Sequence, residues 1–463
     1  MKRSALLSTL TLLIGLLVGA APARAAPPDI ADQLRAVPGL TILAEDPPPA
    51  AGLRFFHLAV TQPVDHRDPS AGTFEQRMTL LHVGTDRPMV LHTTGYGVPD
   101  YAFRSEPTRL VNGNQLSVEQ RFFTPSRPEP ADWTDLNIWQ AATDHHRIVV
   151  ALQEIYTQKW ISTGASKGGM TSIYHRRFYP GDVDGTVAYV APQDVNEQED
   201  SRYDQFFTRV GTAACRKALD DVQVEALNRR AALVAKYEAW AAANGRTFTI
   251  VHGADRAFEF MVNGTTWAFW QYSGLAQCAQ VPSVSVSNDA LLAWIDQIYG
   301  FDSNTDQGIT GYVPYYYQAA TQLGYPTPKL RHLAKLQHYR GEDEAKSYVP
   351  EALAPKFRPN AMDDIDRWVR GSGSELLFVY GQNDPWGAEP FELGSGTRDS
   401  LSYIAPGANH GASIAALVPA EAATATAAVQ RWAGVTTSSP AAKSESAVDE
   451  RDPALDRRFS LRG

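Results

Sequence analysis

Several short apolar runs along the chain have the character of buried β-strands. We expect strands at Leu53–Val60, Phe74–Val83, Pro88–Thr94, Gln115–Phe122, Trp160–Thr163, Gly185–Val190, Leu376–Tyr380 and Leu401–Ile404. Residues Leu136–Tyr156 carry apolar side chains at helical spacing, and further helices are expected after Gly168 and over Ala412–Trp432. Strands that alternate with helices predict an α/β fold in which helices cover both faces of a mostly parallel sheet.

Strand candidates become scarce between Asn196 and Arg370, where Ala, Tyr, Trp and good helix formers dominate, as in Val222–Ala243. We therefore predict one α/β core built from residues 26–195 and 371–436. A mainly helical cap, residues 196–370, would be inserted into this core after the sixth strand.

The first 25 residues have the three parts of a secretory signal peptide: Lys2-Arg3, an uncharged stretch to Ala23, and Ala23-Arg24-Ala25. A membrane anchor is the alternative, but Thr, Ser, Gly and Pro interrupt the apolar stretch, and no second run of membrane-spanning length follows. We expect a secreted protein with no membrane attachment after cleavage. Residues 437–463 are polar, without apolar periodicity, and are expected to form a flexible tail.

Composition narrows the classes of protein further. The 42 basic and 51 acidic residues give a net charge of −9, and the absence of any block of like charge argues against nucleic-acid binding. Two cysteines exclude a disulfide-dense scaffold and a four-cysteine zinc site. Export would allow Cys215 and Cys278 to pair, the alternative being two free buried thiols. No metal or cofactor site is predicted, because Asp302–Asp306 lacks the glycine and glutamate of a calcium loop.

The segment Trp160–Gly169 holds the pattern Gly-x-Ser-x-Gly, with a predicted strand before it and a helix after it. A serine at such a tight turn adopts a strained backbone, and the start of the following helix offers N–H groups to a developing negative charge. An ordinary glycine turn is the alternative. We expect Ser166 to be a catalytic nucleophile.

A serine nucleophile needs a base and a group that orients the base. Among 11 histidines, His410 alone follows a late strand and precedes the last helix, the position of the general base in α/β-hydrolases. Asp384 follows the preceding strand, three residues after Gly381, and would orient His410. For the oxyanion hole we expect the N–H groups of Lys167 and Tyr96, with Gly95 as the alternative to Tyr96.

Several segments resemble one known family, the secreted prolyl tri/tetrapeptidyl aminopeptidases of actinobacteria. The resemblance rests on Gln62–Pro69, Gly72–Arg77, Val118–Phe123, Trp160–Gly169, Ser201–Tyr203 and Trp267–Tyr272, and runs from about Leu53 to Trp432. It implies an α/β-hydrolase fold and a serine exopeptidase that removes tri- or tetrapeptides from free N-termini, with proline favoured before the cut bond. The family's serine, aspartate and histidine would correspond to Ser166, Asp384 and His410.

A peptide substrate with a free N-terminus brings a buried ammonium, which needs a carboxylate or several acceptors. The acidic candidates are Glu197, Glu199, Asp200 and Glu259. A proline ring needs an apolar, aromatic pocket, for which the candidates are Tyr203, Phe206, Phe207, Trp267, Trp270 and Trp386. Two other functions remain open at this point: a secreted esterase or lipase with the same triad, and a binding protein on a hydrolase scaffold.

Overall fold

The structure is a computed structural model that describes residues 28–435 and Val448. The predicted signal peptide, residues 1–25, and the predicted tail, residues 437–463, lie outside the described residues apart from that valine. Val448 belongs to a buried cluster with three side chains of the core, Phe55, Leu81 and Ala102. The expectation of a flexible tail is therefore wrong at this one residue.

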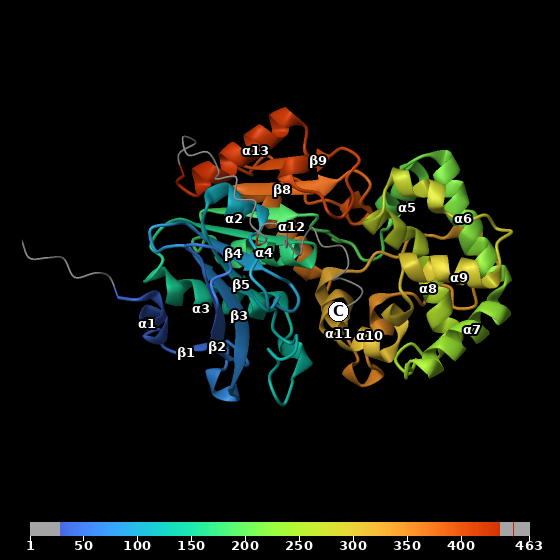
Figure 1. Ribbon diagram of the computed structural model, residues 1–463, viewed down its shortest axis with the longest axis horizontal. Coiled ribbons are helices and arrows are strands. Elements are labelled where there is room, and N and C mark those ends of the chain that lie inside the picture. The colour runs from blue at the N-terminus through green and yellow to red at the C-terminus, as the bar shows by residue number, and fades with distance from the viewer. Residues whose placement is uncertain (1–27, 436–447, 449–463) are drawn as a thin grey trace, which may run out of the picture.

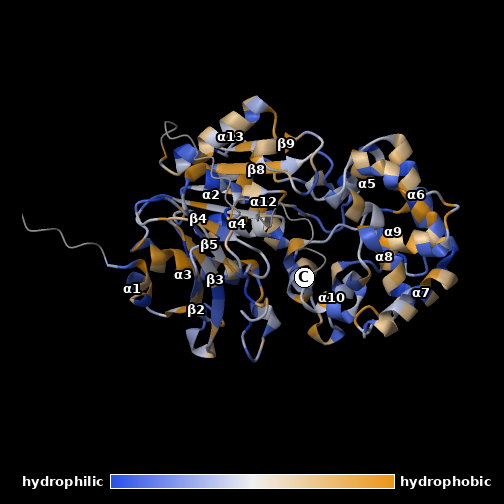
Figure 2. Cartoon of the chain, viewed as in Figure 1, coloured by the Kyte–Doolittle hydropathy of each residue, from blue (hydrophilic) through white to orange (hydrophobic). Residues whose placement is uncertain are grey.

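In the described part of the chain, nine strands form one sheet in the order β1-β2-β3-β5-β4-β6-β7-β8-β9. Their bounds are β1 Leu40–Asp46, β2 Arg54–Pro63, β3 Thr73–His82, β4 Met89–Thr93, β5 Asn114–Val118, β6 Trp160–Ala165, β7 Gly185–Tyr189, β8 Leu376–Gly381 and β9 Leu401–Ala405. The strands from β5 to β9 along this order are parallel, whereas β1, β2 and β3 pair antiparallel. Both faces of the parallel part are buried, which is why β8 is buried throughout and mainly orange in Figure 2.

Helices cover both faces of the sheet. Their bounds are α1 Ile30–Arg35, α2 Glu106–Val111, α3 Ile138–Gln153, α4 Lys167–Phe178, α5 Ser201–Arg209, α6 Ala213–Asn228, α7 Arg230–Ala243, α8 Ala254–Tyr272, α9 Asn288–Ile298, α10 Asp306–Thr310, α11 Val313–Gln318, α12 Asn360–Ser372 and α13 Pro419–Trp432. On one face α3, α4 and α12 pack together, and on the other α2 packs against α13 (Figure 1). The predicted α/β fold is confirmed.

Two features of the predicted order need correction. β1 was not expected, because most of its side chains are exposed and its sequence lacks a continuous apolar run. With β1 included, the helical region follows the seventh strand, β7, and not the sixth. The stretch of helix formers at Val222–Ala243 belongs to two helices, α6 and α7, separated at Arg229.

Helices α5 to α10, which follow β7, form a body beside the sheet, with α5 to α9 at the right of Figure 1. We call α5 to α10 the helical insertion; its own apolar cluster surrounds α8 and includes Phe258, Met261 and Trp270. By contrast, α12 packs on α4 and the sheet through Met362 and Ile365. The expected cap boundary at residue 370 is therefore too late. Across residues 28–435, no helix combines the length and the hydropathy that crossing a membrane requires.

A disulfide bond joins Cys215 at the start of α6 to Cys278, as predicted. The two cysteines are 63 residues apart, and closing such a loop stabilises the fold by about 4 kcal/mol in the chain-entropy model. The double variant Cys215→Ala/Cys278→Ala should lose about this much free energy of unfolding in urea titrations. Dithiothreitol should lower the stability of the wild type and leave the double variant unchanged. A loss below about 1 kcal/mol would contradict the expectation.

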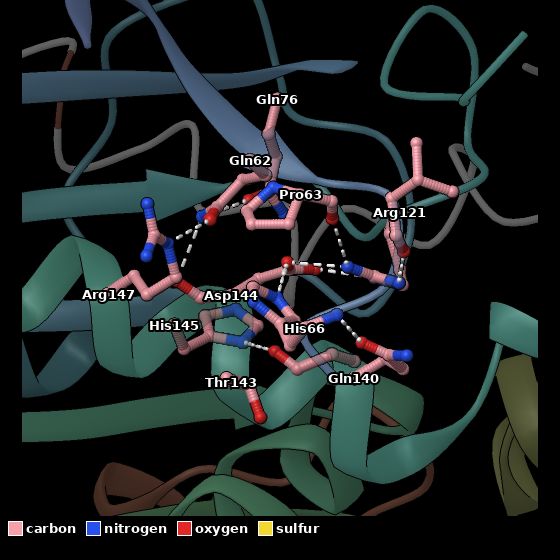
Figure 3. Close-up of polar contacts among 12 residues, drawn as sticks. Gln62, Pro63, His66, Gln76, Arg121, Gln140, Thr143, Asp144, His145 and Arg147 are labelled. Carbon is pink, nitrogen blue, oxygen red and sulfur yellow. Dashed lines mark hydrogen bonds and ion pairs between the residues drawn. The ribbon is translucent and has the colours of Figure 1, made fainter. Parts of the chain in front are cut away.

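A buried polar network ties α3 to two loops of the core (Figure 3). The Arg121 guanidinium, after β5, donates through Nε and Nη2 to both carboxylate oxygens of Asp144 in α3, each at 2.7 Å. His66 Nε2, after β2, lies 2.7 Å from Asp144 Oδ1. Neither Arg121 nor Asp144 exposes any side-chain surface. Burial alone would raise the pKa of Asp144, but Arg121 and His66 hold it below its ordinary value.

Candidate active site

Ser166 lies between β6 and α4 with a backbone φ of 55° and ψ of −128°. This conformation costs a residue with a side chain about 1–3 kcal/mol and holds the hydroxyl out of the turn. The turn is possible because Gly164 and Gly168 lack Cβ atoms. A Cβ on Gly164 would collide with the carbonyl of Gly168, and one on Gly168 would collide with the carbonyl of Thr93. The predicted strand–turn–helix is therefore present around Ser166.

Asp384 and His410 approach one another from the ends of two neighbouring strands. Asp384 follows β8, and His410 follows β9. The Asp384 Oδ2 atom lies 2.8 Å from His410 Nδ1, while its other oxygen accepts the Trp386 N–H at 3.1 Å. The Asp384 side chain is fully buried and that of His410 is 10% exposed. This arrangement fixes the ring orientation and leaves Nε2 as the free ring nitrogen.

Ser166 and His410 line the same cavity, whose volume is about 1600 Å³. No hydrogen bond between the two is present among the described residues, and His410 Nε2 is buried without a hydrogen-bond partner there. The Ser166 side chain is close enough to the buried Tyr96 phenol to act on its pKa. Catalytic hydrogen bonds are often long in a free enzyme and tighten once substrate is bound.

The N–H groups expected to form an oxyanion hole come from the loop after β4 and from the start of α4. Lys167 is the first residue of α4, so its N–H has no partner within the helix. The Tyr96 N–H donates to Thr94 Oγ1 at 3.2 Å. Gly95 has a φ of +74° and packs so closely on Gly168 that a Cβ there would collide with its backbone. The structure therefore holds this loop against the helix start.

The side chain of Lys167 is buried beneath this loop. Its Nζ donates to the Gly95 carbonyl at 2.6 Å and lies 5.6 Å from the ring centres of Tyr96 and Phe123. Burial lowers the pKa of Lys167 to about 7. Sequence analysis expected only the Lys167 N–H to act, and nothing in the local sequence indicated that the ammonium group turns inward.

Aromatic side chains from the sheet edge and from the helical insertion form part of the cavity lining. Of the aromatic residues predicted to line a proline pocket, Tyr203, Phe207, Trp267, Trp270 and Trp386 do line it, and Phe206 does not. Trp386 is central to this wall, because its ring lies 4.8 Å from Trp267 and 6.4 Å from His410.

The acidic residues predicted to bind an ammonium occupy different environments. Glu197 is half-buried, and its Oε2 accepts the Tyr325 N–H at 2.9 Å. Asp200 accepts the Thr327 hydroxyl at 2.9 Å. Glu259 does not line the cavity: its carboxylate is buried in the insertion and accepts from Arg230 and from the N–H groups of His338 and Tyr339. The Glu259 carboxylate is thus engaged within the insertion, and Glu197 and Asp200 are not among the residues that line the cavity either.

The sequence profile of the PS-10 peptidase S37 family matches residues 23–462. The chain belongs to this family. A curated relative, the prolyl tri/tetrapeptidyl aminopeptidase of Streptomyces mobaraensis, is 54% identical over 443 residues, which make up 94% of this chain and 92% of the relative. The protein is therefore a serine peptidase with a peptide substrate, and these matches support the esterase alternative less well.

Solved α/β-hydrolases are also similar to this S37 peptidase, at low identity. A proline iminopeptidase of Mycobacterium smegmatis is 13% identical, with a TM-score of 0.35 over 81% of this chain and 98% of the other. The peroxisomal α/β-hydrolase Lpx1 of Saccharomyces cerevisiae is 10% identical, with a TM-score of 0.38 over 89% and 98% of the two chains.

Asp194, one of five acidic residues that line the peptidase's cavity, was not among the predicted ammonium-binding residues. Asp194 lies beyond the end of β7, lines the cavity and is 4% exposed. Its position after a strand of the parallel sheet was the available signal, because the carboxyl ends of β6, β7 and β8 lie at one edge.

Proposed function

We propose that the protein is an exported serine aminopeptidase that releases tri- and tetrapeptides from free N-termini after proline. The observation that carries this proposal is the common cavity of Ser166 and the Asp384–His410 pair, walled by aromatic side chains of the helical insertion. The printed activity of the 54% identical relative supports the substrate class. The disulfide supports export, since such bonds persist in oxidising compartments.

In the proposed reaction Ser166 is the nucleophile and His410 is the general base. Ser166 Oγ bonds to the carbonyl carbon of the scissile peptide while His410 Nε2 takes the hydroxyl proton. The C–N bond then breaks, and His410 gives this proton to the departing amine. Water repeats the sequence on the ester, which releases the short peptide and restores Ser166. Asp384 stabilises the charged imidazole in both halves.

The step requires the Ser166 hydroxyl to turn towards His410 Nε2, which has no hydrogen-bond partner among the described residues. A rotation about the serine Cα–Cβ bond is enough to redirect a hydroxyl group. We assign the oxyanion to the N–H groups of Lys167 and Tyr96, with Gly95 as the alternative to Tyr96. Substrate would compete with Thr94 Oγ1 for the Tyr96 N–H, whose 3.2 Å bond is long.

The proline ring before the cut bond would lie against Trp386, close to His410. Trp386, Trp267 and Tyr203 form a continuous aromatic surface, with ring centres 4.8 Å and 5.7 Å apart along it. Such a surface suits a rigid apolar ring.

Mass spectrometry of peptide products tests the proposed specificity. A heptapeptide with proline at position three should yield its N-terminal tripeptide, and moving the proline to position four should yield the tetrapeptide. Acetylating the N-terminus should slow release by about 100-fold, since a buried binding site for the ammonium would lose its partner. Equal release from free and acetylated peptides would contradict the aminopeptidase assignment.

A further inference from the structure

Asp194 is a buried carboxylate that the proposed reaction does not use. Only 4% of its surface is exposed, and its Oδ2 atom accepts no hydrogen bond from any described group. An ionised carboxylate left in this state is costly, so a buried one is normally paired with a cation or several donors. Asp194 therefore stays protonated unless a positively charged group or several donors reach it.

The residues around Asp194 increase its need for a positively charged partner. Glu197 and Glu389 are the charged groups with the largest effects on its pKa, and both are acidic and raise it. The Glu197 carboxyl can share a proton with Asp194 but otherwise adds further acceptors. The local chain holds these groups together, because the Gln193 N–H donates to the Glu389 carbonyl at 3.1 Å.

Basic side chains near this group of acids are engaged elsewhere. Arg202 offsets only part of the rise that burial causes in the pKa of Glu389, and its Nη1 donates to Glu392 at 2.6 Å. Lys329 acts on Asp200, and its Nζ lies 3.6 Å from Asp204. Gly324 packs directly on the Asp194 carboxyl, where any Cβ would collide with it, so the carboxyl is confined at the cavity wall.

The pKa values of these three carboxyl groups are those expected where no positive charge is close by. Burial, followed by the neighbouring carboxylates, raises the pKa of Asp194 to about 8. Burial likewise raises the pKa of Glu197 and of Glu389 to about 7. A bound cation would lower all three pKa values towards their ordinary range. The carboxylates ionised in this way would in turn stabilise the bound cation.

We propose that Asp194, assisted by Glu197, binds the α-ammonium group of the peptide substrate; this inference rests on the aminopeptidase function proposed above. The site lies at the same strand edge as Ser166, because β7 is adjacent to β6 in the sheet. Three or four extended residues span roughly 10–14 Å. An ammonium held at Asp194 would thus fix which peptide bond reaches Ser166 and limit the product to a short peptide.

The variant Asp194→Asn tests the proposal because it keeps the shape and removes the charge. For a free-N-terminus heptapeptide with proline at position three, kcat/KM should fall roughly 30-fold or more. For the acetylated peptide kcat/KM should stay within about 3-fold of the wild type, and so should the rate of labelling by a fluorophosphonate. Glu197→Gln should show the same selective loss to a smaller extent. Glu238→Gln, at an exposed position of α7 outside the cavity, is the matched control and should behave like the wild type.

The possible outcomes separate this inference from the function on which it rests. If the wild type prefers the free peptide and both Asp194→Asn and Glu197→Gln keep that preference, the ammonium site is elsewhere. If both variants lose activity on free and acetylated peptides alike while labelling normally, the carboxyls shape the cavity and do not bind the ammonium. If the wild type itself does not distinguish the two peptides, the aminopeptidase assignment fails first.

Discussion

Ser166→Ala should lower kcat for peptide hydrolysis by roughly 10⁶-fold, the scale seen when a serine nucleophile is removed from a triad. The loss follows because no other described hydroxyl lies at the turn between β6 and α4, where Ser166 opens into the cavity. The fold should remain, since the Ser166 side chain makes no cap hydrogen bond to α4. Steady-state kinetics and labelling by a fluorophosphonate probe measure the effect, and labelling should disappear.

Ser172→Ala is the matched control for this experiment. Ser172 lies on the same helix, is buried, and donates to the Gly169 carbonyl away from the cavity. It should keep both labelling and turnover. Asp384→Asn should label slowly and lose about 10⁴-fold in kcat, because the His410 ring would lose its orienting carboxylate. Labelling or turnover retained in Ser166→Ala would overturn the mechanism and favour a binding protein or another nucleophile.

Asp144→Asn should lower the free energy of unfolding by about 3–5 kcal/mol. The change removes the only carboxylate that Arg121 contacts in the described structure and leaves a buried guanidinium without its counter-charge. Thermal and urea denaturation measure the loss. The expected cost is large because Arg121 is fully buried and cannot turn to water.

An exposed pair and a double variant make this prediction specific. Asp32→Asn breaks an ion pair with Arg35 in which both side chains are more than half exposed, and it should cost less than about 1 kcal/mol. The double variant Arg121→Met/Asp144→Leu should recover much of the stability, since apolar replacements remove both charges together. An Asp144→Asn protein as stable as Asp32→Asn would show that the network contributes little.

The parts of the fold and site that could be predicted from the sequence are those encoded locally. The Gly-x-Ser-x-Gly turn is specified by neighbouring residues, because only glycine allows the close approaches at Gly164 and Gly168. His410 and Asp384 were identified by their order after late strands, and the parallel sheet brings such strand ends to one edge. Their hydrogen bond of 2.8 Å follows from that topology.

The remainder depends on contacts between distant segments. β1 carries mostly exposed side chains, so its pairing with β2 left no apolar signature. Asp194 packs against Gly324, which follows the helical insertion 130 residues later in the sequence, so no local pattern reveals its burial. The Glu259 carboxylate accepts from Arg230, which is 29 residues away in the sequence, so the local sequence gave no sign that this acidic side chain is paired. The closeness of Ser166 to Tyr96 likewise depends on how two loops pack.

The Arg121–Asp144–His66 network affects how the activity of homologous sequences can be inferred. His66 and Arg121 belong to two of the segments on which the resemblance to prolyl tri/tetrapeptidyl aminopeptidases rests, and Asp144 lies in α3. None of the three lines the cavity. These two segments therefore indicate the fold and do not indicate whether a protein is catalytically active. A homologue could retain them, fold normally and have lost its hydrolytic residues, so inactive paralogues should be sought by inspecting positions equivalent to 166, 384 and 410 separately.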